Sequence, residues 1–401
     1  MKKKRQRYFE KIVEGSLFLT STLSSIFVIF IIILLFKEGI GLFNKPVIEE
    51  NHIIAVNPNN PVNNLSSKQI KDIFNQDITN WKDVGGNNQD ILLFTVNDIF
   101  DYYNAEEIGS EFEHLAEKIN ELIISKPNII VYVPKQYVSS DFSGKRISTE
   151  KISIIKVLTG REWYPTSEPA YQFGILPLIL GTLLVSFGAI AIALPIGLIT
   201  ALFMAEVADF RLRNFLKPVI ELLAAIPSVV YGFFGLVIVV PMIQKLFNLQ
   251  VGETALAGSI IIGIMALPTI ITITEDALQK VPVSLREASL ALGANRLQTL
   301  FRISIPYAKS GIATASILGI GRAIGETMAV LMVTGNASVI PSSFLQPVRT
   351  IPATIAAELG EAPIGGIHFK ALFFLGIVLF IITMLFNLIV TVIKSKQKFS
   401  K

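Results

Sequence analysis

The stretch VPVSLREASLALGANRLQTLFRISIP, residues 281–306, decides how this chain folds, because it is a polar, turn-rich segment between two long apolar runs. Pro282 is expected to end the preceding helix, since proline has no amide hydrogen to donate. Ser284 would then begin a capping box that Glu287 closes three residues later. Gly293 fits the left-handed position that follows a helix. The pattern predicts a short cytoplasmic helix.

A second short helix is predicted directly after the first, starting at Asn295 and stopping before Pro306. In the first helix, Leu285, Ala288 and Leu292 would line one side. A compact helical hairpin with one apolar side suits insertion into a groove of another protein. It suits a position on the membrane surface equally well.

Six apolar runs lie on the two sides of this segment, and each is long enough to cross a bilayer. They cover residues 16–36, 175–204, 219–247, 256–273, 312–333 and 371–393. The basic residues concentrate at the N-terminus, at the C-terminus and in the polar loops after the second and fourth runs. The positive-inside rule places these parts, both termini included, on the cytoplasmic side. An α-helical membrane protein with about six transmembrane helices is predicted.

The composition supports a membrane protein and excludes several other classes. Of 401 residues, 51% are hydrophobic and only 16% are charged, against roughly a quarter charged in a typical soluble domain. A net charge of +4 is too small to indicate nucleic-acid binding. There are no cysteines, and the three histidines are far apart in the sequence, so no metal site is expected.

A polar segment between the first two runs predicts a small α/β domain on the outer side. Ser66 begins a capping box with Gln69, apolar residues recur at helical spacing over 104–124, and residues 91–96 and 128–133 are rich in strand-forming residues. The predicted domains are 1–43 with the first helix, 44–156 as this insert, and 157–401 as the remaining membrane part, which contains the polar loop 275–306.

No enzyme constellation is present in the sequence. The pair Gly144-Lys145 lacks the upstream glycine of a phosphate-binding loop. Gly319, Gly321 and Gly325 have the wrong spacing for a dinucleotide fingerprint and lie in an apolar run. We therefore expect no catalytic residue and no cofactor, and any energy input would come from a partner.

Glu287-Ala288-Ser289, then Gly293, then Ile303-Ser304-Ile305-Pro306 resembles the EAA loop of ABC-importer permeases. Only Ser289 and Ile305 depart from that pattern. In that family the loop is a coupling helix that docks in a cleft of the ATPase subunit, and the fold is the type I permease fold. The resemblance therefore favours the groove over the membrane surface, and implies ATPase coupling by Ser284, Glu287, Ala288, Gly293 and Pro306.

Three further stretches resemble phosphate-specific permeases of the PstC type. They are ELLAAIPSVVYGFFG (221–235), GIGRAIGETMAV (319–330) and LTGREWYP (158–165). The resemblance implies a permease subunit that passes phosphate by alternating access in a bacterial inner membrane, in contact with lipid. It also implies three partners: a second permease of the PstA type, a pair of ATP-binding subunits of the PstB type, and a phosphate-binding protein of the PstS type.

Arg322 and Glu326 are the candidate pathway residues, together with Thr327. Arg322 and Glu326 lie four residues apart in an apolar run, so they share one face of a helix and could form an ion pair. Charged groups at that depth are costly and usually mark a pathway. The alternative is an ion pair that fixes helix packing, which Gly321 and Gly325 would support by letting helices approach closely. A switch is consistent with both the pathway role and the ion pair. Glu326 would hold Arg322 in one state and release it to phosphate in the other.

The insert contains LSSKQIKDIF (65–74) and ITNWKDVGG (78–86), which resemble a segment of phosphate-binding proteins. The arginine and the Ser-Gly-Thr stretch that hold phosphate in those proteins do not follow here. We expect a fragment of a binding-protein lobe that serves as a dock for the separate binding protein. A structural cap and direct phosphate binding are the alternatives.

Two rival functions remain at this level. A membrane-anchored phosphate sensor would need cytoplasmic signalling machinery, and the cytoplasmic parts are short. An importer for another oxyanion or a phosphonate would have the same coupling loop.

Overall fold

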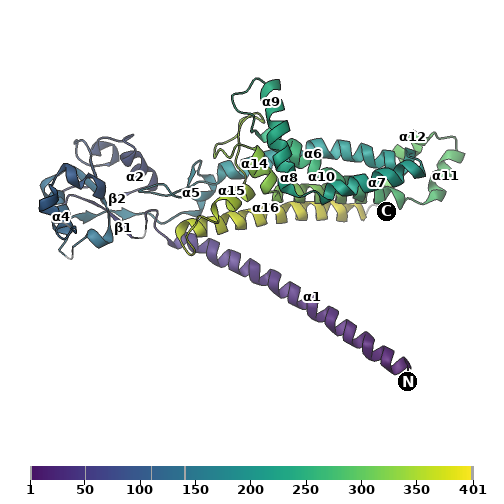
Figure 1. Ribbon diagram of the computed structural model, residues 1–401, viewed down its shortest axis with the longest axis horizontal. Helices are drawn as coiled ribbons and strands as arrows, with labels where there is room; N and C mark the ends of the chain where they lie inside the picture. Colours follow the sequence, from purple (N-terminus) through teal and green to yellow (C-terminus); the bar gives the residue numbers. More distant parts are fainter. Residues whose placement is uncertain (1, 50, 110, 140, 399–401) are drawn as a thin grey trace. The chain divides into compact units, whose positions relative to one another are not determined.

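The computed structural model describes residues 2–49, 51–109, 111–139 and 141–398. The chain divides into two compact units (Figure 1). The membrane unit combines the residues up to Gly39 with those from Leu176 on, and the insert comprises Ile40–Ile175.

Within the described residues, five helices are long and apolar enough to cross a membrane, judged by length and composition. They are Val13–Asn44, Leu176–Val207, Ser228–Leu246, Ala255–Gln279 and Ile367–Ile389. The elements that form them are α1 (Lys2–Ile40), α6 (Leu176–Leu202), α8 (Ser228–Phe234) with α9 (Val240–Leu246), α10 (Ala255–Gln279) and α16 (Ile367–Lys398). Three π-helical turns lie in the described part of this unit: η5 (Phe203–Val207), η6 (Gly235–Val239) and η7 (Leu300–Ser304).

The third predicted run, 219–247, is not one helix. Its first part belongs to α7 (Phe210–Ala225), and Ile226 is extended with ψ 127°. The cause is Pro227, which disfavours the helical region for the residue before it and which caps the start of α8. The crossing segment is therefore Ser228–Leu246.

The fifth predicted run, 312–333, is also divided. α13 (Ile305–Gly325) ends where Glu326 takes an extended backbone with ψ 131°, and α14 (Met328–Val333) follows. The fifth predicted crossing is thus a broken helix, which is why the described residues contain five continuous candidate spans and not six.

Helix α10 forms the centre of the membrane unit and packs against α6 and α13. The buried residues at this junction are mostly small: Ala189, Ala193 and Ala266 are fully buried. Gly197 faces Ile270 so closely that a Cβ on it would come 2.7 Å from the isoleucine side chain. Small side chains let helices approach closely, and packing contacts then hold them together.

The end of α1 packs on the start of α16. Glu38 accepts a hydrogen bond from Lys370 at 3.1 Å, and the rings of Phe36 and Phe380 lie edge to face at 6.4 Å. Earlier in α1 the apolar side chains are exposed, for example Phe18. The cytoplasmic position of the two termini stays a prediction.

The insert is built on a four-stranded sheet with the order β3-β4-β1-β5. The strands are β3 (Leu92–Thr95), β4 (Ile129–Pro134), β1 (His52–Val56) and β5 (Lys145–Arg146). β4 pairs parallel with β3 and antiparallel with β1, where Ala55 lies opposite Val131. α4 (Leu115–Ser125) buries Leu115, Ile119 and Ile123 in the core of this sheet.

The structure confirms the capping box of α2 (Ser67–Phe74), in which both reciprocal bonds between Ser66 and Gln69 are made. The single helix predicted over 104–124 is instead α3 (Ala105–Ile108) followed by α4. It breaks because Gly109 and Phe112 both have positive φ, 86° and 63°.

The insert extends beyond its predicted end at residue 156, to Ile175. The added part is α5 (Ile154–Thr159) and the hairpin of β7 (Trp163–Tyr164) and β8 (Gln172–Phe173). It is tied back to the start of the insert by the backbone bridge of Ile48 with Ala170 and by the amide of Tyr171, which donates to the carbonyl of Val47 at 3.0 Å. The remaining elements of the insert are η1 (Gly41–Asn44), β2 (Asn64–Leu65), η2 (Trp81–Val84), η3 (Val96–Asp101), η4 (Lys135–Tyr137) and β6 (Ser148–Thr149).

Candidate translocation and coupling sites

Arg322 and Glu326 do not form the predicted pair. α13 ends at Gly325, so Glu326 leaves the helical path before its side chain can lie over Arg322. Arg322 Nη1 instead lies 3.4 Å from the hydroxyl of Thr269 on α10, and among the described residues it has no carboxylate partner. The arrangement therefore corresponds to the unpaired state of the predicted switch, and the switch itself stays a prediction.

Thr327 lies in the break between α13 and α14. Its hydroxyl donates to the carbonyl of Gly325 at 3.1 Å, so it provides a hydrogen-bond donor for a carbonyl at the end of α13. It shares with Arg322 and Glu326 a half-buried environment near the end of α13.

Gly321 and Gly325 have no close neighbour of the kind predicted for helix packing, as far as the described residues show. Among the described residues, no atom outside the local helix backbone lies within 4 Å of the position where a Cβ on either one would lie. The small residues that do pack are Gly311, which meets Ala277, and Gly319, which meets Ile270 at 3.0 Å. With the fully buried Ala315 they form a stripe four residues apart. The sequence analysis did not identify this stripe, although its spacing of four residues could have indicated the packing face.

The predicted coupling loop folds as α11 (Val283–Ala291), α12 (Arg296–Thr299) and the π-helical turn η7. The capping box predicted at Ser284 is not formed: Pro282 is the N-cap, and the helix starts earlier than expected. Proline suits a helix start because its missing amide hydrogen is not needed there. Gly293 has φ 86° and its amide donates to Leu290, as predicted for a helix end.

The second predicted helix does not stop before Pro306. A capping box of Asn295 and Gln298 starts α12 as expected, but the helical path continues through η7 into α13. Pro306 is the second residue of α13 and lies inside this continuous helical path, where it has no amide hydrogen to donate to the turn before it.

The residues predicted to contact the ATPase lie on the exposed surface of the loop. Ser284, Glu287 and Ala288 are all exposed. Exposed apolar side chains surround them: Val283, Leu285, Leu290, Leu292 and Leu297, with Leu292 89% exposed. Leu285, Ala288 and Leu292, predicted to line one side, are therefore available to another molecule.

Arg286 fastens this exposed helix to the membrane unit. Its Nη2 donates to the carbonyl of Leu278 at the end of α10, at 2.6 Å, and forms an ion pair with Glu206 in η5 at 3.3 Å. The hydroxyls of Ser289 and Thr299, 2.9 Å apart, tie α11 to α12. A displacement of α11 would therefore reach α10 directly and α6 through η5.

A buried carboxylate links α10 to α7 at the same end. Glu275 is 1% exposed, and its oxygens lie 2.8 Å from Arg213 Nε and 3.4 Å from Lys217 Nζ. Burial lowers the pKa of Lys217, but the carboxylates of Glu275 and Asp276 raise it by more, so the ammonium stays charged. A buried charge with two cationic partners strongly resists separation of the helices that hold it. This cluster was not predicted from the sequence, because its members are about 60 residues apart.

Residues 193–398 match the family described as "Binding-protein-dependent transport system inner membrane component". The chain belongs to this family. Residues 35–133 match the PBP superfamily domain, so the permease part and a binding-protein-like part occur in one chain. The type I permease fold and the binding-protein-like insert predicted from the sequence are thereby confirmed.

The curated relatives of this permease match over most of their own length. The "Probable ABC transporter permease protein YqgH" of Bacillus subtilis is 42% identical over 62% of this chain and 80% of the relative. The "Phosphate transport system permease protein PstC" of Mesorhizobium japonicum is 38% identical over 57% of this chain and 74% of the relative. A solved inward-facing methionine ABC transporter, MetNI, covers 57% of this chain and 99% of its own at 18% identity and a TM-score of 0.43. The family match and the curated relatives together establish the permease family.

Proposed function

We propose that this chain is the transmembrane permease subunit of an ATP-driven phosphate importer. The observation that carries the proposal is the exposed helix α11, which presents Glu287 and apolar side chains outward while Arg286 ties it to α10 and η5. Relatives named as PstC phosphate permeases, 35–38% identical, support phosphate as the substrate.

The mechanism follows from the connections of α11. Phosphate carries charge that hydrocarbon does not accept, so it needs a polar route open to one side at a time. Closure of two ATP-binding subunits of the PstB type would displace α11. Arg286 would pass the displacement to α6 and α10, and Glu275 would pass it to α7. Arg322, which has no carboxylate partner among the described residues, would meet phosphate in the opened route.

The remaining partners complete the importer. A second permease of the PstA type would supply the other half of the route, because one set of about six helices makes only half. A PstS-type protein would deliver phosphate, with the insert as its dock outside a bacterial inner membrane. Both termini would be cytoplasmic, and ATP hydrolysis would belong to the PstB-type subunits, leaving this chain without a catalytic role.

The test is uptake of radiolabelled phosphate by phosphate-starved cells that carry Glu287→Lys. We expect uptake to fall to background, because a reversed charge on the exposed face of α11 disrupts docking of the ATP-binding subunit. Glu361→Lys is the matched control, since it makes the same change at an exposed site away from this loop. Normal uptake by Glu287→Lys, with the protein present in the membrane, contradicts coupling through α11.

Substrate class is tested separately by competition. Excess unlabelled phosphate should suppress uptake, while molybdate, sulfate and phosphonates should not. Suppression by one of those at lower concentration than phosphate would identify a different oxyanion as the substrate. Deletion of the chain tests the sensor alternative. If the chain is a sensor that transports nothing, phosphate uptake should not change when it is deleted.

A further inference from the structure

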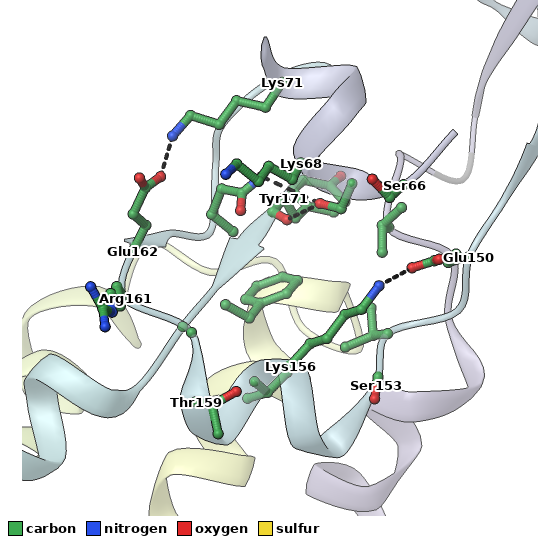
Figure 2. Close-up of a pocket in the computed structure, with 18 of the residues that line it drawn as sticks. Ser66, Lys68, Lys71, Glu150, Ser153, Lys156, Thr159, Arg161, Glu162 and Tyr171 are labelled. Carbon is green, nitrogen blue, oxygen red and sulfur yellow. Dashed lines mark hydrogen bonds and ion pairs between the residues drawn. The ribbon is translucent and has the colours of Figure 1, made fainter. Parts of the chain in front are cut away.

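The insert contains a cavity of about 470 Å³ between two walls that are far apart in the sequence (Figure 2). One wall is the start of α2. The other is residues 150–161 with α5, and strand β8 lies between them. Pockets of about 300–1,000 Å³ are the size that holds small molecules. All of the lining residues belong to the insert.

Basic side chains exceed acidic ones in this cavity, with five basic and three acidic lining residues. The basic ones are Lys68, Lys71, Lys151, Lys156 and Arg161, and the acidic ones are Asp72, Glu150 and Glu162. Figure 2 shows Lys71 and Lys156 reaching from opposite walls to their carboxylate partners, Glu162 and Glu150.

Three of the five cations remain available. Among the described residues, Lys68, Lys151 and Arg161 form no ion pair. Asp72 is the one lining carboxylate outside the two pairs. The cavity therefore has an excess of positive charge that its own carboxylates do not neutralise, and such an excess attracts an anion.

Two glycines that line the cavity, Gly160 and Gly174, are in close backbone contact. A Cβ on Gly160 would lie 2.6 Å from the Cα of Gly174, so neither position has room for a side chain. The amide of Gly174 donates to the carbonyl of Glu162 at 2.7 Å. On the opposite wall, the hydroxyl of Ser67 donates to the carbonyl of Tyr171. These contacts hold the two walls at a set separation.

We propose that this cavity binds a phosphate group, either free phosphate or the headgroup of a phospholipid. Lysine and arginine side chains make charge-assisted hydrogen bonds to phosphate oxygens, and Ser153 and Thr159, which carry hydroxyls, line the same space. The second wall and strand β8 lie outside the part that matches the PBP superfamily domain, residues 35–133.

The inference goes beyond the proposed function, because the cavity and the transport residues lie in different units. Binding in the cavity can be followed by intrinsic tryptophan fluorescence. Its two tryptophans, Trp81 and Trp163, both lie in the insert. Trp163 packs edge to face against Phe173, which lines the cavity, with ring centroids 6.0 Å apart. Intrinsic tryptophan fluorescence of the full chain therefore reports on the insert.

The experiment titrates the full chain in phosphatidylcholine nanodiscs with inorganic phosphate and follows tryptophan fluorescence. A second arm replaces part of the lipid with phosphatidic acid and omits phosphate. The test variants are Lys68→Gln/Lys151→Gln and, separately, Arg161→Gln, all at exposed positions. Lys82→Gln/Lys126→Gln is the matched control at exposed sites that do not line the cavity.

We expect the test variants to weaken the response by about tenfold or more, since each removes charge-assisted hydrogen bonds, and the control to change it by less than about twofold. A response to phosphate identifies the free anion, and a response only to phosphatidic acid identifies a headgroup. No response in either arm, or an equal loss in the control, overturns the proposal. Arg322→Gln should keep the full response while losing uptake, so the failure of this proposal is distinguishable from failure of the proposed function.

Discussion

Arg322 shows how one residue's partner depends on where a helix ends. The side chain lies in the last turn of α13, and its neighbour is Thr269 of α10 at 3.4 Å. Had the helix continued, Glu326 would have lain over it one turn later. The extended backbone at Glu326 removes that contact and leaves the guanidinium without a carboxylate from the described part of the chain.

The unpaired arrangement predicts that Arg322 and Glu326 act independently, an outcome that would contradict the switch predicted from the sequence. Arg322→Gln should abolish phosphate uptake, whereas Glu326→Gln should keep most of it. In a double-mutant cycle on the unfolding of the purified protein, the two changes should add within about 0.5 kcal/mol. A coupling energy well above that value would mean that the two residues pair in a populated state.

At the scale of elements, α13 packs on α10 through its small residues. Gly311 and Gly319 meet side chains of α10, and Ala315 between them is fully buried. Gly321 and Gly325, by contrast, have open space where a Cβ would lie, as far as the described residues show. One helix thus carries two glycine patterns, and only the buried one holds the two helices together.

Gly311→Ala should therefore destabilise the protein by about 1–3 kcal/mol, because the added methyl overlaps Ala277. Gly321→Ala is the matched control and should be neutral or stabilise by up to about 1 kcal/mol, as alanine favours a helix over glycine. Thermal unfolding of the detergent-purified protein measures both. Equal destabilisation by the two substitutions would argue against this packing face.

At the scale of the whole molecule, the two units have separate cores. The insert buries Ile119, Phe94 and Val131 around its own sheet, and the membrane unit buries alanines around α10. Because each unit has its own buried apolar residues, each is expected to unfold on its own.

Ile119→Ala tests this separation. The side chain is fully buried in the insert, and its truncation should cost about 2–5 kcal/mol. The unfolding transition seen by tryptophan fluorescence should move to lower temperature, since both tryptophans lie in the insert. The helical circular dichroism signal, which comes mainly from the membrane unit, should keep its transition. Simultaneous loss of both signals would mean that the units unfold together.

Features that depend on neighbours along the chain could be predicted from the amino-acid sequence alone. The apolar runs predicted the membrane class, the box of Ser66 and Gln69 predicted the start of α2, and Gly293 predicted the end of α11. Residues 281–306 also predicted an exposed helical loop. Periodicity and capping act within a few residues, so they can be read without knowing the fold.

Features that join distant segments could be seen only in the folded chain. The partner of Arg322 is 53 residues away, and Glu275 meets Arg213 across 62. The cavity in the insert needs α2 and residues 150–174 to close on each other. Sequence spacing did not reveal these contacts, because they depend on which helix faces meet and where each helix ends, and packing of the whole unit sets both.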